Sequence, residues 1–488
     1  MGSFNGNAQG GRFSTRKSGT KKRGAPAWKQ IVFSLLLLLD LFLVYTIVMQ
    51  LTHTQNVFTA SKGANCLLLG VFIIGAIGLL WAVIHSNAWK RLLCLFLIFC
   101  ICYLTVAFSE IPTIKNLRDI WIKTALATMQ HHGLATFYFP SSAVDAIRQE
   151  LNEAIRIQDE VRSTDPVAPG ETVTGEEEGE DPSETWNDPE EFASMTPEQR
   201  QFYRIFHELD VESTEAYFAE HPEALENGYM NVLINEAGLK ADGTTIRTRL
   251  DEKVLAIDVP NQILIVEVDC DGSRGVLAIA KQADRLHLFP SSKLPYYGET
   301  VGAIANRNGG ILAMTGSGFD DPGGVGNGGK VAGYAMCNGT SYNGEPFRSG
   351  HKRLELRSNG WFYITDTYAA VHKDTTDAME FRPAMVVNGE EVDIEYWTDY
   401  NPRACIGQSK KGEILMLCVE GRGAGGSWGC SLTYCRDVFM QHDCQTAMNC
   451  DGGTTAIMWY RGEPIMRCSN SAIPQGRYLP NAWVYQGE

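Results

Sequence analysis

Residues 254–280 read VLAIDVPNQILIVEVDCDGSRGVLAIA. Three short runs within them, residues 254–259, 263–268 and 276–280, are rich in Val, Ile and Leu and are separated by turn-forming residues such as Pro, Asn, Asp and Gly. Apolar runs of this length between turn residues are typical of β-strands. The stretch therefore predicts that this part of the chain is built on a β-sheet.

Similar runs follow towards the C-terminus, at residues 286–289, 413–419 and 456–460. Between the last two, residues 433–442 have the pattern of a helix. Strands interrupted by a helix in this way predict a mixed α+β domain, which we place over residues 251–488.

A helical segment is expected just before this domain, over residues 193–250. Thr196 is followed by Pro197 at the first helical position and by Gln199, which completes a capping box. The apolar residues that follow recur at helical spacing and predict a packing helix: Phe202, Ile205, Phe206 and Leu209.

Two segments of different composition precede that helix. Residues 110–162 have apolar residues at helical spacing and a capping signal at Ser142 and Asp145, which predict a helical stalk or docking helix. Residues 163–192 are rich in Pro, Gly, Thr and Glu and cannot bury a core. We predict that they form an acidic, disordered linker.

Three apolar stretches lie near the N-terminus, at residues 31–51, 66–84 and 92–108, and each is long enough to cross roughly 30 Å of hydrocarbon as a helix. The first is too long for a signal peptide, and two more follow it. Asp40 interrupts the first stretch, but the other two contain no ionisable group in their interior. We therefore expect a three-helix transmembrane anchor over residues 31–109, without a transport path.

Basic residues set the expected orientation of this anchor. Residues 1–30 contain seven Lys or Arg and no acid, and the short loop after the second stretch contains Lys90 and Arg91. Positive charges of this kind stay in the cytoplasm. Three crossings then place the chain after residue 108 outside, which predicts a multi-pass cell-membrane protein with a cytoplasmic basic tail and an extracytoplasmic C-terminal domain.

Charge and cysteine usage agree with this location. The net charge of −15 argues against a nucleic-acid partner. Nine of the 13 cysteines follow residue 250, where an oxidising compartment would allow disulfides. Their number is odd and their pairing cannot be read from the sequence, and no matched pair of CxxC motifs indicates zinc. The oligomeric state is left open.

Three segments contain residues suited to chemistry. Residues 316–330, GSGFDDPGGVGNGGK, either bring the backbone close to a ligand or form a long surface turn. A GxxxxGK match ends this segment, but Val331 stands where a Walker loop needs Ser or Thr, which excludes an ATP site. Arg403, in NPRACIGQ, and Arg422, in EGR, are suited to phosphate or to surface ion pairs.

The third segment, residues 447–455, reads AMNCDGGTT. Here Asp451 is followed by two glycines and two hydroxyl side chains. The segment either holds a carboxylate beside a substrate or is an ordinary turn.

Together these segments resemble the phosphodiester glycosidase family, which includes phosphodiester α-N-acetylglucosaminidase. The resemblance runs from about residue 254 to residue 485. It rests on six segments in order: GSGFDDPGGVGNGG, FRPAMVVNG, NPRACIGQ, VEGRG, NCDGGTTAIM and RYLPNAWV. Bacterial members with a few N-terminal spans also have a segment like residues 119–140, so the anchor fits the resemblance.

The resemblance implies hydrolysis of a sugar-1-phosphodiester in cell-surface or exopolysaccharide glycans, which releases the sugar and leaves a phosphomonoester. No cofactor or metal is expected. A carboxylate would stabilise positive charge on the sugar or activate water, with Asp451 the first candidate and Glu420 the second. Substrate or phosphate contacts are expected from Arg403, Arg422, Gly316, Asp320, Asp321, Asn327, Gly328, Gly329, Asn449, Gly452, Gly453 and Thr454.

Some of these assignments leave alternatives open. Asp320 and Asp321 would repel each other in one phosphate pocket, so they are expected to support the loop or to bond sugar hydroxyls. Asn449 and Thr454 could instead make local turn hydrogen bonds. Thr315 stands where the family is expected to have Asn, and Glu420 where Asp is frequent. A non-catalytic glycan-binding or exopolysaccharide-assembly protein of the same fold is therefore the alternative.

Overall fold

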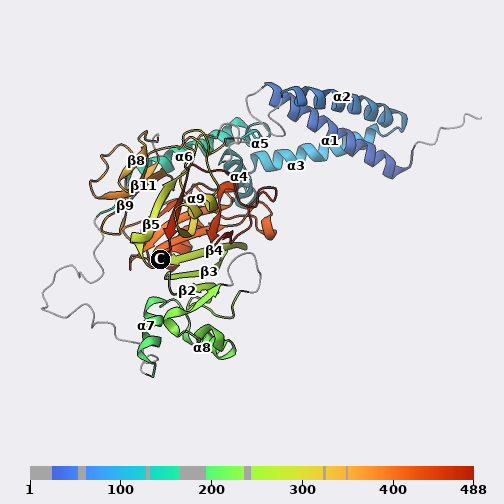
Figure 1. Ribbon diagram of the computed structural model, residues 1–488. Helices are drawn as coiled ribbons and strands as arrows, with labels where there is room; N and C mark the ends of the chain where they lie inside the picture. Colours follow the sequence, from blue (N-terminus) through green and yellow to red (C-terminus); the bar gives the residue numbers. More distant parts are fainter. Residues whose placement is uncertain are drawn as a thin grey trace, which may run out of the picture. The chain divides into compact units, whose positions relative to one another are not determined.

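The computed structural model describes residues 25–52, 62–127, 132–164, 194–235, 243–321, 326–347 and 350–487. They form two compact units that meet in the sequence after Ser109 (Figure 1). Residues 1–24 of the predicted basic tail and residues 165–192 of the predicted linker lie outside the described part.

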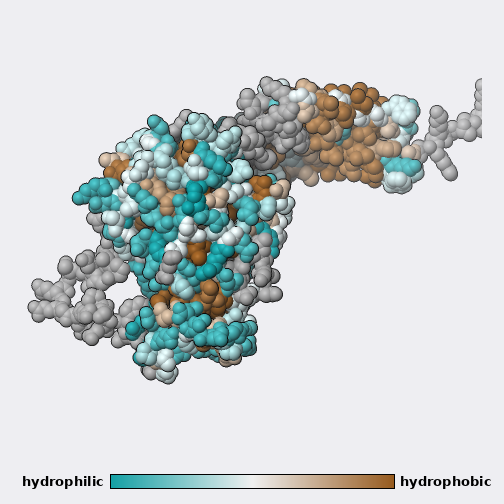
Figure 2. Space-filling model, in the orientation of Figure 1, coloured by the Kyte–Doolittle hydropathy of each residue, from teal (hydrophilic) through white to brown (hydrophobic). Residues whose placement is uncertain are grey.

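The first unit consists of three helices, α1 (Ala27–Thr52), α2 (Lys62–His85) and α3 (Trp89–Phe108). Each is long and apolar enough to cross a membrane. Their surface is apolar along most of its length (Figure 2). Asp40 of α1 faces Gly75 of α2, where a Cβ would lie 3.2 Å from Asp40 Oδ1. The missing side chain at Gly75 therefore makes room for this carboxyl group.

The second unit begins with three helices, α4 (Pro112–Ala127), α5 (Gly133–Thr136) and α6 (Ser141–Glu160). Pro140 occupies the N-cap of α6, and no side chain caps it. The capping role predicted for Ser142 was therefore wrong, although the helix itself is present.

The C-terminal end of α6 is docked on the sheets of this unit. The Gln158 side-chain amide donates to Ala384 O (3.1 Å) and accepts from Ala384 N (2.8 Å). Beyond the helix, Ser163 N donates to Ile364 O (2.9 Å), and Ser163 Oγ accepts from Ile364 N (2.8 Å). These bonds fix the end of α6 to two different sheet segments.

The next helices are α7 (Pro197–Ile205) and α8 (Val211–Glu220), followed by the short 3-10 helices η2 (Pro222–Leu225) and η3 (Tyr229–Asn231). The predicted capping box is confirmed: Thr196 Oγ1 accepts from Gln199 N, and Gln199 Oε1 accepts from Thr196 N. Phe202 and Phe206 are fully buried in the main core. The predicted packing face is therefore confirmed at these two positions.

Nine antiparallel strands form the largest sheet, in the order β1-β2-β3-β4-β15-β14-β16-β12-β13. Their bounds are β1 Leu233–Asn235, β2 Lys253–Asp258, β3 Ile263–Cys270, β4 Ser273–Ala280, β12 Ala384–Val387, β13 Glu390–Glu391, β14 Arg403–Ser409, β15 Ile414–Val419 and β16 Cys444–Asn449. Strands β2, β3 and β4 lie side by side in Figure 1 and correspond to the three apolar runs of residues 254–280. Strands β14 and β15 are buried along their whole length.

Two five-stranded sheets complete the unit, in the orders β10-β9-β11-β7-β8 and β18-β17-β6-β19-β5. Their bounds are β5 Leu286–Pro290, β6 Gly310–Thr315, β7 Ala335–Cys337, β8 Thr340–Asn343, β9 Lys352–Arg357, β10 Phe362–Asp366, β11 Thr375–Phe381, β17 Met458–Tyr460, β18 Glu463–Pro464 and β19 Asn481–Gln486. Helix α9 (Val301–Arg307) packs on β6 and β19, and α10 (Leu432–Gln441) packs on β12 and β16. The α+β class and the helix predicted over residues 433–442 are thus confirmed.

The described residues contain none of the disulfides that an oxidising compartment would allow. All 13 cysteines lie within the described residues, and all are free thiols. Cys430 Sγ and Cys435 Sγ lie 3.4 Å apart in the buried core.

Candidate active site

Asp451 lies where the chain passes from the nine-stranded sheet to another sheet. It follows β16 and precedes the 3-10 turn η7 (Gly453–Thr455), which leads into β17. Its backbone N donates to Gly316 O (3.1 Å), just after β6 of that second sheet. Asp451, Gly452 and Gly453 are all partly exposed. Asp451 therefore sits at the junction of two sheets with part of the residue exposed.

The surroundings of Asp451 favour its protonated form. Burial among neighbouring atoms raises the pKa of this carboxyl to about 7. This pKa value already includes a raising effect of the Asp321 carboxylate and lowering effects of the Thr455 hydroxyl and the Arg477 guanidinium. A group that is half ionised near neutral pH is well suited to accept and return a proton.

Arg422, which follows β15, lies against the turn after Asp451. Its Nη1 donates to Thr454 Oγ1 (3.0 Å) and its Nη2 to Asn401 Oδ1 (3.2 Å). Gly453 has a φ of +66°, and a Cβ there would lie 2.9 Å from Arg422 Nη2. Glycine is therefore needed for this close approach.

The positive charge of Arg422 is not neutralised by the groups that hold it. Both acceptors, Thr454 and Asn401, are uncharged. Within the described part of the chain, no carboxylate forms an ion pair with this guanidinium, and the neighbouring Arg403 adds a second positive charge. This corner of the site therefore favours an anion.

Arg403, at the start of β14, is paired with an acid. Its Nη2 donates to Asp399 Oδ2 (3.0 Å) and to the backbone carbonyl of Asp399, and its Nε donates to Cys430 O (3.0 Å). Both charged side chains are buried. Arg403 is therefore a buried supporting residue of the site, and its positive charge is paired with the Asp399 carboxylate.

Glu420, the second candidate carboxylate, is also fully engaged. Its Oε1 accepts from Arg274 Nη1 (2.9 Å) and from Arg467 N (2.8 Å), and its Oε2 accepts from Arg467 Nη1 (3.3 Å). The side chain is completely buried. Both oxygens of Glu420 therefore have donors in the structure.

The two acids of the glycine segment face different partners. Arg477 Nη1 donates to Asp321 Oδ2 (2.6 Å), Arg477 Nη2 donates to Asp321 Oδ1 (2.9 Å), and Gly326 N donates to the same Oδ1 (2.6 Å). Asp320 is exposed and accepts from Lys330 Nζ (3.1 Å). The Asp321–Arg477 pair therefore orders the loop beside Asp451, whereas Asp320 lies at the surface.

The ends of the glycine segment are bound to other loops. Near its start, Ser317 N donates to Asn481 Oδ1 (2.8 Å). Near its end, Asn327 Nδ2 donates to Tyr296 O (2.9 Å), and Gly329 N donates to Asn327 Oδ1 (3.0 Å).

Gly328, in the same part of the segment, is in close contact with a neighbouring loop. It has a φ of +70°, and a Cβ there would lie 2.3 Å from Tyr478 O. Residues 322–325, in the middle of the segment, lie outside the described residues.

Asn449 and Thr454 make hydrogen bonds within the protein. Asn449 is the last residue of β16, and its Nδ2 donates to Arg382 O (2.8 Å), just before the neighbouring strand β12. Thr454 Oγ1 accepts from Arg422 and lies 3.3 Å from Ser469 Oγ. Asn449 therefore holds the backbone around the site, and Thr454 helps to position Arg422.

The sequence analysis did not identify several residues that organise this site. The partners of its charged groups are Asp399, Arg274, Arg467 and Arg477. Arg477 opens the RYLPNAWV segment, so its place in that motif was the available signal. The other three lie in segments without a distinctive pattern.

The side chains that could bind a metal ion lie away from Asp451. In the described part of the chain, the His, Cys, Asp or Glu side chains that converge closely enough to hold a metal ion are His207, Glu208 and Glu413. They lie near the opposite end of β14 and β15 from Asp451.

Comparisons with known proteins bear on this domain. Residues 302–486 match the family model of the phosphodiester glycosidases. No curated protein gives a significant match.

The solved structures that are similar to the chain include the following two. One is the catalytic domain of zebrafish N-acetylglucosamine-1-phosphodiester α-N-acetylglucosaminidase, auto-inhibited by its pro-peptide, with 14% identity over 46% of this chain and 82% of that one, and a TM-score of 0.38. The other is a hypothetical protein from Synechocystis, with 12% identity over 49% of this chain and 65% of that one, and a TM-score of 0.34. The similarity of this chain to the phosphodiester glycosidase family thus rests on residues 302–486.

Proposed function

We propose that the chain is a membrane-anchored phosphodiester glycosidase that hydrolyses a sugar-1-phosphodiester outside the cytoplasm. The reaction breaks the bond between C1 of the sugar and the bridging oxygen. The sugar is released, and a phosphomonoester remains on the other product. The family match over residues 302–486 supports the reaction class.

The observation that carries this proposal is the pairing of a proton-accepting carboxylate with an uncompensated guanidinium. Asp451 has a pKa of about 7. Arg422 approaches Gly453, two residues further along the chain, with a charge that no acid among the described residues neutralises. A phosphodiester glycosidase needs both an acid–base group at C1 and a positive charge at the phosphate.

In this mechanism, ionised Asp451 accepts a proton from the attacking water as the water oxygen bonds to C1. The electron pair of the breaking bond passes to the bridging oxygen, so negative charge grows on the phosphate. Arg422 stabilises that charge. Positive charge on the sugar ring is stabilised by the same carboxylate.

We assign supporting roles to the other predicted site residues. Arg403 and Glu420 hold the strand ends beneath the site through their ion pairs. Asp321 orders the glycine segment, in which the backbone of Gly316, Asn327, Gly328 and Gly329 would border the substrate. Asp320, Asn449, Gly452, Gly453 and Thr454 complete the rim, with direct substrate contact proposed for the partly exposed Gly452, Gly453 and Thr454.

The three helices α1–α3 support attachment to a lipid bilayer. We propose the orientation set by the basic residues, with the N-terminus in the cytoplasm and the second unit outside. The substrates would then be phosphodiester-containing glycans of the cell surface or of an exopolysaccharide. No nucleic acid is involved.

The test uses the full-length protein in detergent with a panel of sugar-1-phosphodiesters in ¹⁸O-labelled water. The expected products are free sugar and a phosphomonoester in equal amounts, with no ¹⁸O in the phosphomonoester. Label in the phosphomonoester, or release of a sugar-1-phosphate, would show cleavage at phosphorus and overturn the proposal.

The engagement of both Glu420 oxygens favours a second candidate function. The Glu420 carboxylate is bonded to Arg274 and Arg467. A protein of the same fold could then bind a glycan phosphodiester without cleaving it. Saturable binding of the panel compounds without any released sugar would support this non-catalytic function in glycan binding or exopolysaccharide assembly.

A further inference from the structure

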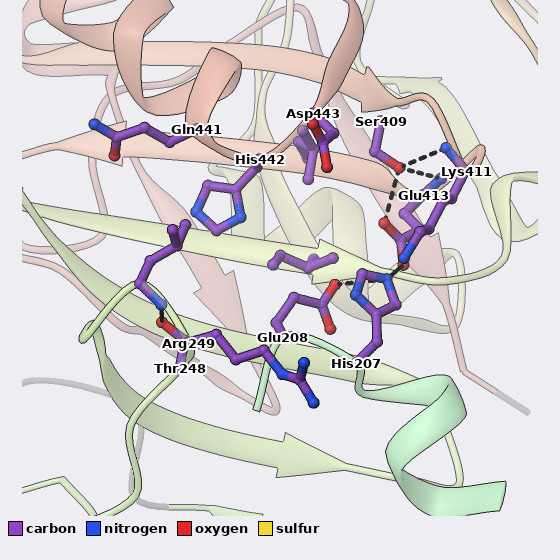
Figure 3. A pocket seen from close by; sticks show the side chains of 13 residues that line it. His207, Glu208, Thr248, Arg249, Ser409, Lys411, Glu413, Gln441, His442 and Asp443 are labelled. Carbon is purple, nitrogen blue, oxygen red and sulfur yellow. Dashed lines mark hydrogen bonds and ion pairs between the residues drawn. The ribbon is translucent and has the colours of Figure 1, made fainter. Parts of the chain in front are cut away.

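A second cluster of ionisable side chains lies at the other end of the central strands. His207 and Glu208 follow α7, Glu413 directly precedes β15, and Lys281 directly follows β4. His207, Glu208 and Glu413 border a cavity of about 180 Å³, and Ser409 and Lys411 lie on the same side of it (Figure 3). The cavity is separate from the Asp451 site.

The cluster combines one imidazole with two carboxylates. His207 Nε2 lies 2.9 Å from Glu413 Oε1 and 3.4 Å from Glu208 Oε1. The three potential ligand atoms lie within 4.8 Å of one another. Figure 3 shows the three side chains converging at one side of the cavity.

Cationic and hydroxyl groups surround the two carboxylates. Lys281 Nζ lies 2.6 Å from Glu208 Oε1 and 2.8 Å from Glu413 Oε1, so one ammonium group is shared by two acids. Ser409 Oγ donates to Glu413 Oε2 (2.8 Å). Lys411 and Arg249 also border the cavity, and the Lys411 ammonium interacts electrostatically with both carboxylates.

Glu208 gives a second, independent indication of a ligand. Its Oε2 is buried and has no hydrogen-bond partner among the described residues, although the side chain is only 10% exposed. Buried polar atoms in native proteins nearly always have a partner. An unpartnered carboxylate oxygen beside a cavity therefore points to a cation or another donor that binds there.

We propose that His207, Glu208 and Glu413 bind a divalent transition-metal ion, with Zn²⁺ the best match. Imidazole nitrogen and carboxylate oxygen are ligands that Zn²⁺ accepts, and three protein ligands leave a position open for water. Lys281 would keep its hydrogen bonds to the carboxylates, as groups around metal ligands commonly do.

This site would act on the fold rather than on the proposed reaction. His207 and Glu208 belong to the segment that follows α7, whereas Glu413 belongs to the central sheet. A bound ion would cross-link the two across 206 residues of sequence. The proposal does not depend on the proposed glycosidase function.

The test titrates tag-free, full-length protein in detergent, after chelator treatment, with Zn²⁺ by calorimetry and with Co²⁺ by visible absorption. We expect one ion per chain, a Co²⁺ absorption band, and a higher melting temperature with Zn²⁺. Glu208→Gln and His207→Asn should each weaken binding by about 100-fold or more, since even partners of metal ligands contribute 10–100-fold.

The matched control is His221→Asn. His221 lies at the end of α8 on the same helical segment and pairs with Glu223 at 3.0 Å, outside the cluster. It should bind Zn²⁺ as the unchanged chain does. Failure of the unchanged chain to bind either ion, or equal binding by folded Glu208→Gln and His207→Asn variants, would overturn the proposal.

Discussion

The two ends of strands β14 and β15 differ in which charged side chains lack a full set of partners. At the Asp451 end, Arg422 is held only by uncharged acceptors. At the other end, Glu208 and Glu413 share one ammonium group, and Glu208 Oε2 accepts no hydrogen bond from the described residues. The ends are about 20 Å apart, at roughly 3.3 Å per residue of β14. One end is suited to an anion and the other to a cation.

This comparison distinguishes charged side chains that stabilise the fold from charged side chains that are suited to bind a ligand. Arg403 and Arg422 lie on neighbouring segments of the same site, yet Arg403 is paired with the buried Asp399 and Arg422 has no acid partner among the described residues. Residue type alone would treat them alike. Their partners distinguish the two roles.

Asp451→Asn should have the largest effect at the anion-binding end. Loss of a group that transfers a proton should reduce the rate of sugar release by about 10²–10⁴-fold. Sugar release by the purified full-length protein is the measurement. Asp145→Asn, which removes an exposed acid of α6 that pairs with Arg148, is the control and should keep its activity. Full activity of Asp451→Asn would remove this residue from the mechanism.

Arg403→Met should mainly affect stability. It leaves Asp399 buried without its ion-pair partner, which should lower the free energy of unfolding by about 3–5 kcal/mol. Chemical denaturation of the full-length chain measures this loss. An unchanged midpoint would mean that the pair contributes little and would weaken the distinction between Arg403 and Arg422.

Arg422→Met should show the opposite pattern. Because the guanidinium is exposed and bonded to uncharged acceptors, stability should hardly change. The value of kcat/KM should fall by about 10²–10³-fold, the range seen when a single group that stabilises developing negative charge is removed. A variant that unfolds as readily as Arg403→Met, with normal turnover, would contradict the proposed phosphate contact.

A change of one pH unit should alter kcat/KM less than these substitutions do. Because the ionised form of Asp451 accepts the proton, kcat/KM should fall about tenfold for each pH unit below the pKa of about 7. A pH–rate profile of the full-length protein tests this. A plateau that extends unchanged down to pH 5 would show that another group, or no titrating group, controls the rate.

The same pKa predicts a modest effect on stability. Folding raises the pKa of Asp451 from 3.8 to about 7, so its stabilising contribution is complete below pH 3.8 and is lost as the pH rises to 7. The Asp451→Asn variant has no carboxyl group at this position, so its stability does not fall with pH for this reason. Its melting temperature relative to the unchanged chain should therefore increase between pH 4 and pH 7, and a constant difference would argue against the shifted pKa.

Local features of the fold could be predicted from the sequence. The apolar runs of residues 254–280 gave β2, β3 and β4, and the Thr196 capping box gave the start of α7. These signals depend on neighbouring residues. The Ser142 signal failed because Pro140 already occupies the N-cap of α6, so two competing local signals lay within a few residues.

Pairing between distant residues could not be predicted. Arg477 and Asp321 are 156 residues apart, and Glu420 and Arg274 are 146 residues apart. Nothing in either local sequence identifies the partner. The cluster of His207, Glu208 and Glu413 was missed for the same reason, since β15 brings Glu413 to a helix turn far away in the chain. Family motifs identified Asp451 as a candidate, but the structure was needed to show which charged groups are paired.

The docking of α6 has a consequence for how the chain responds to proteolysis. Gln158 and Ser163 hold the end of α6 on the sheets through backbone hydrogen bonds at Ala384 and Ile364. A single cut between residues 165 and 192 would therefore divide the chain into two polypeptides that remain bound to each other. The C-terminal fragment should stay with the membrane fraction after such a nick, and detaching it would take denaturant as well as a protease.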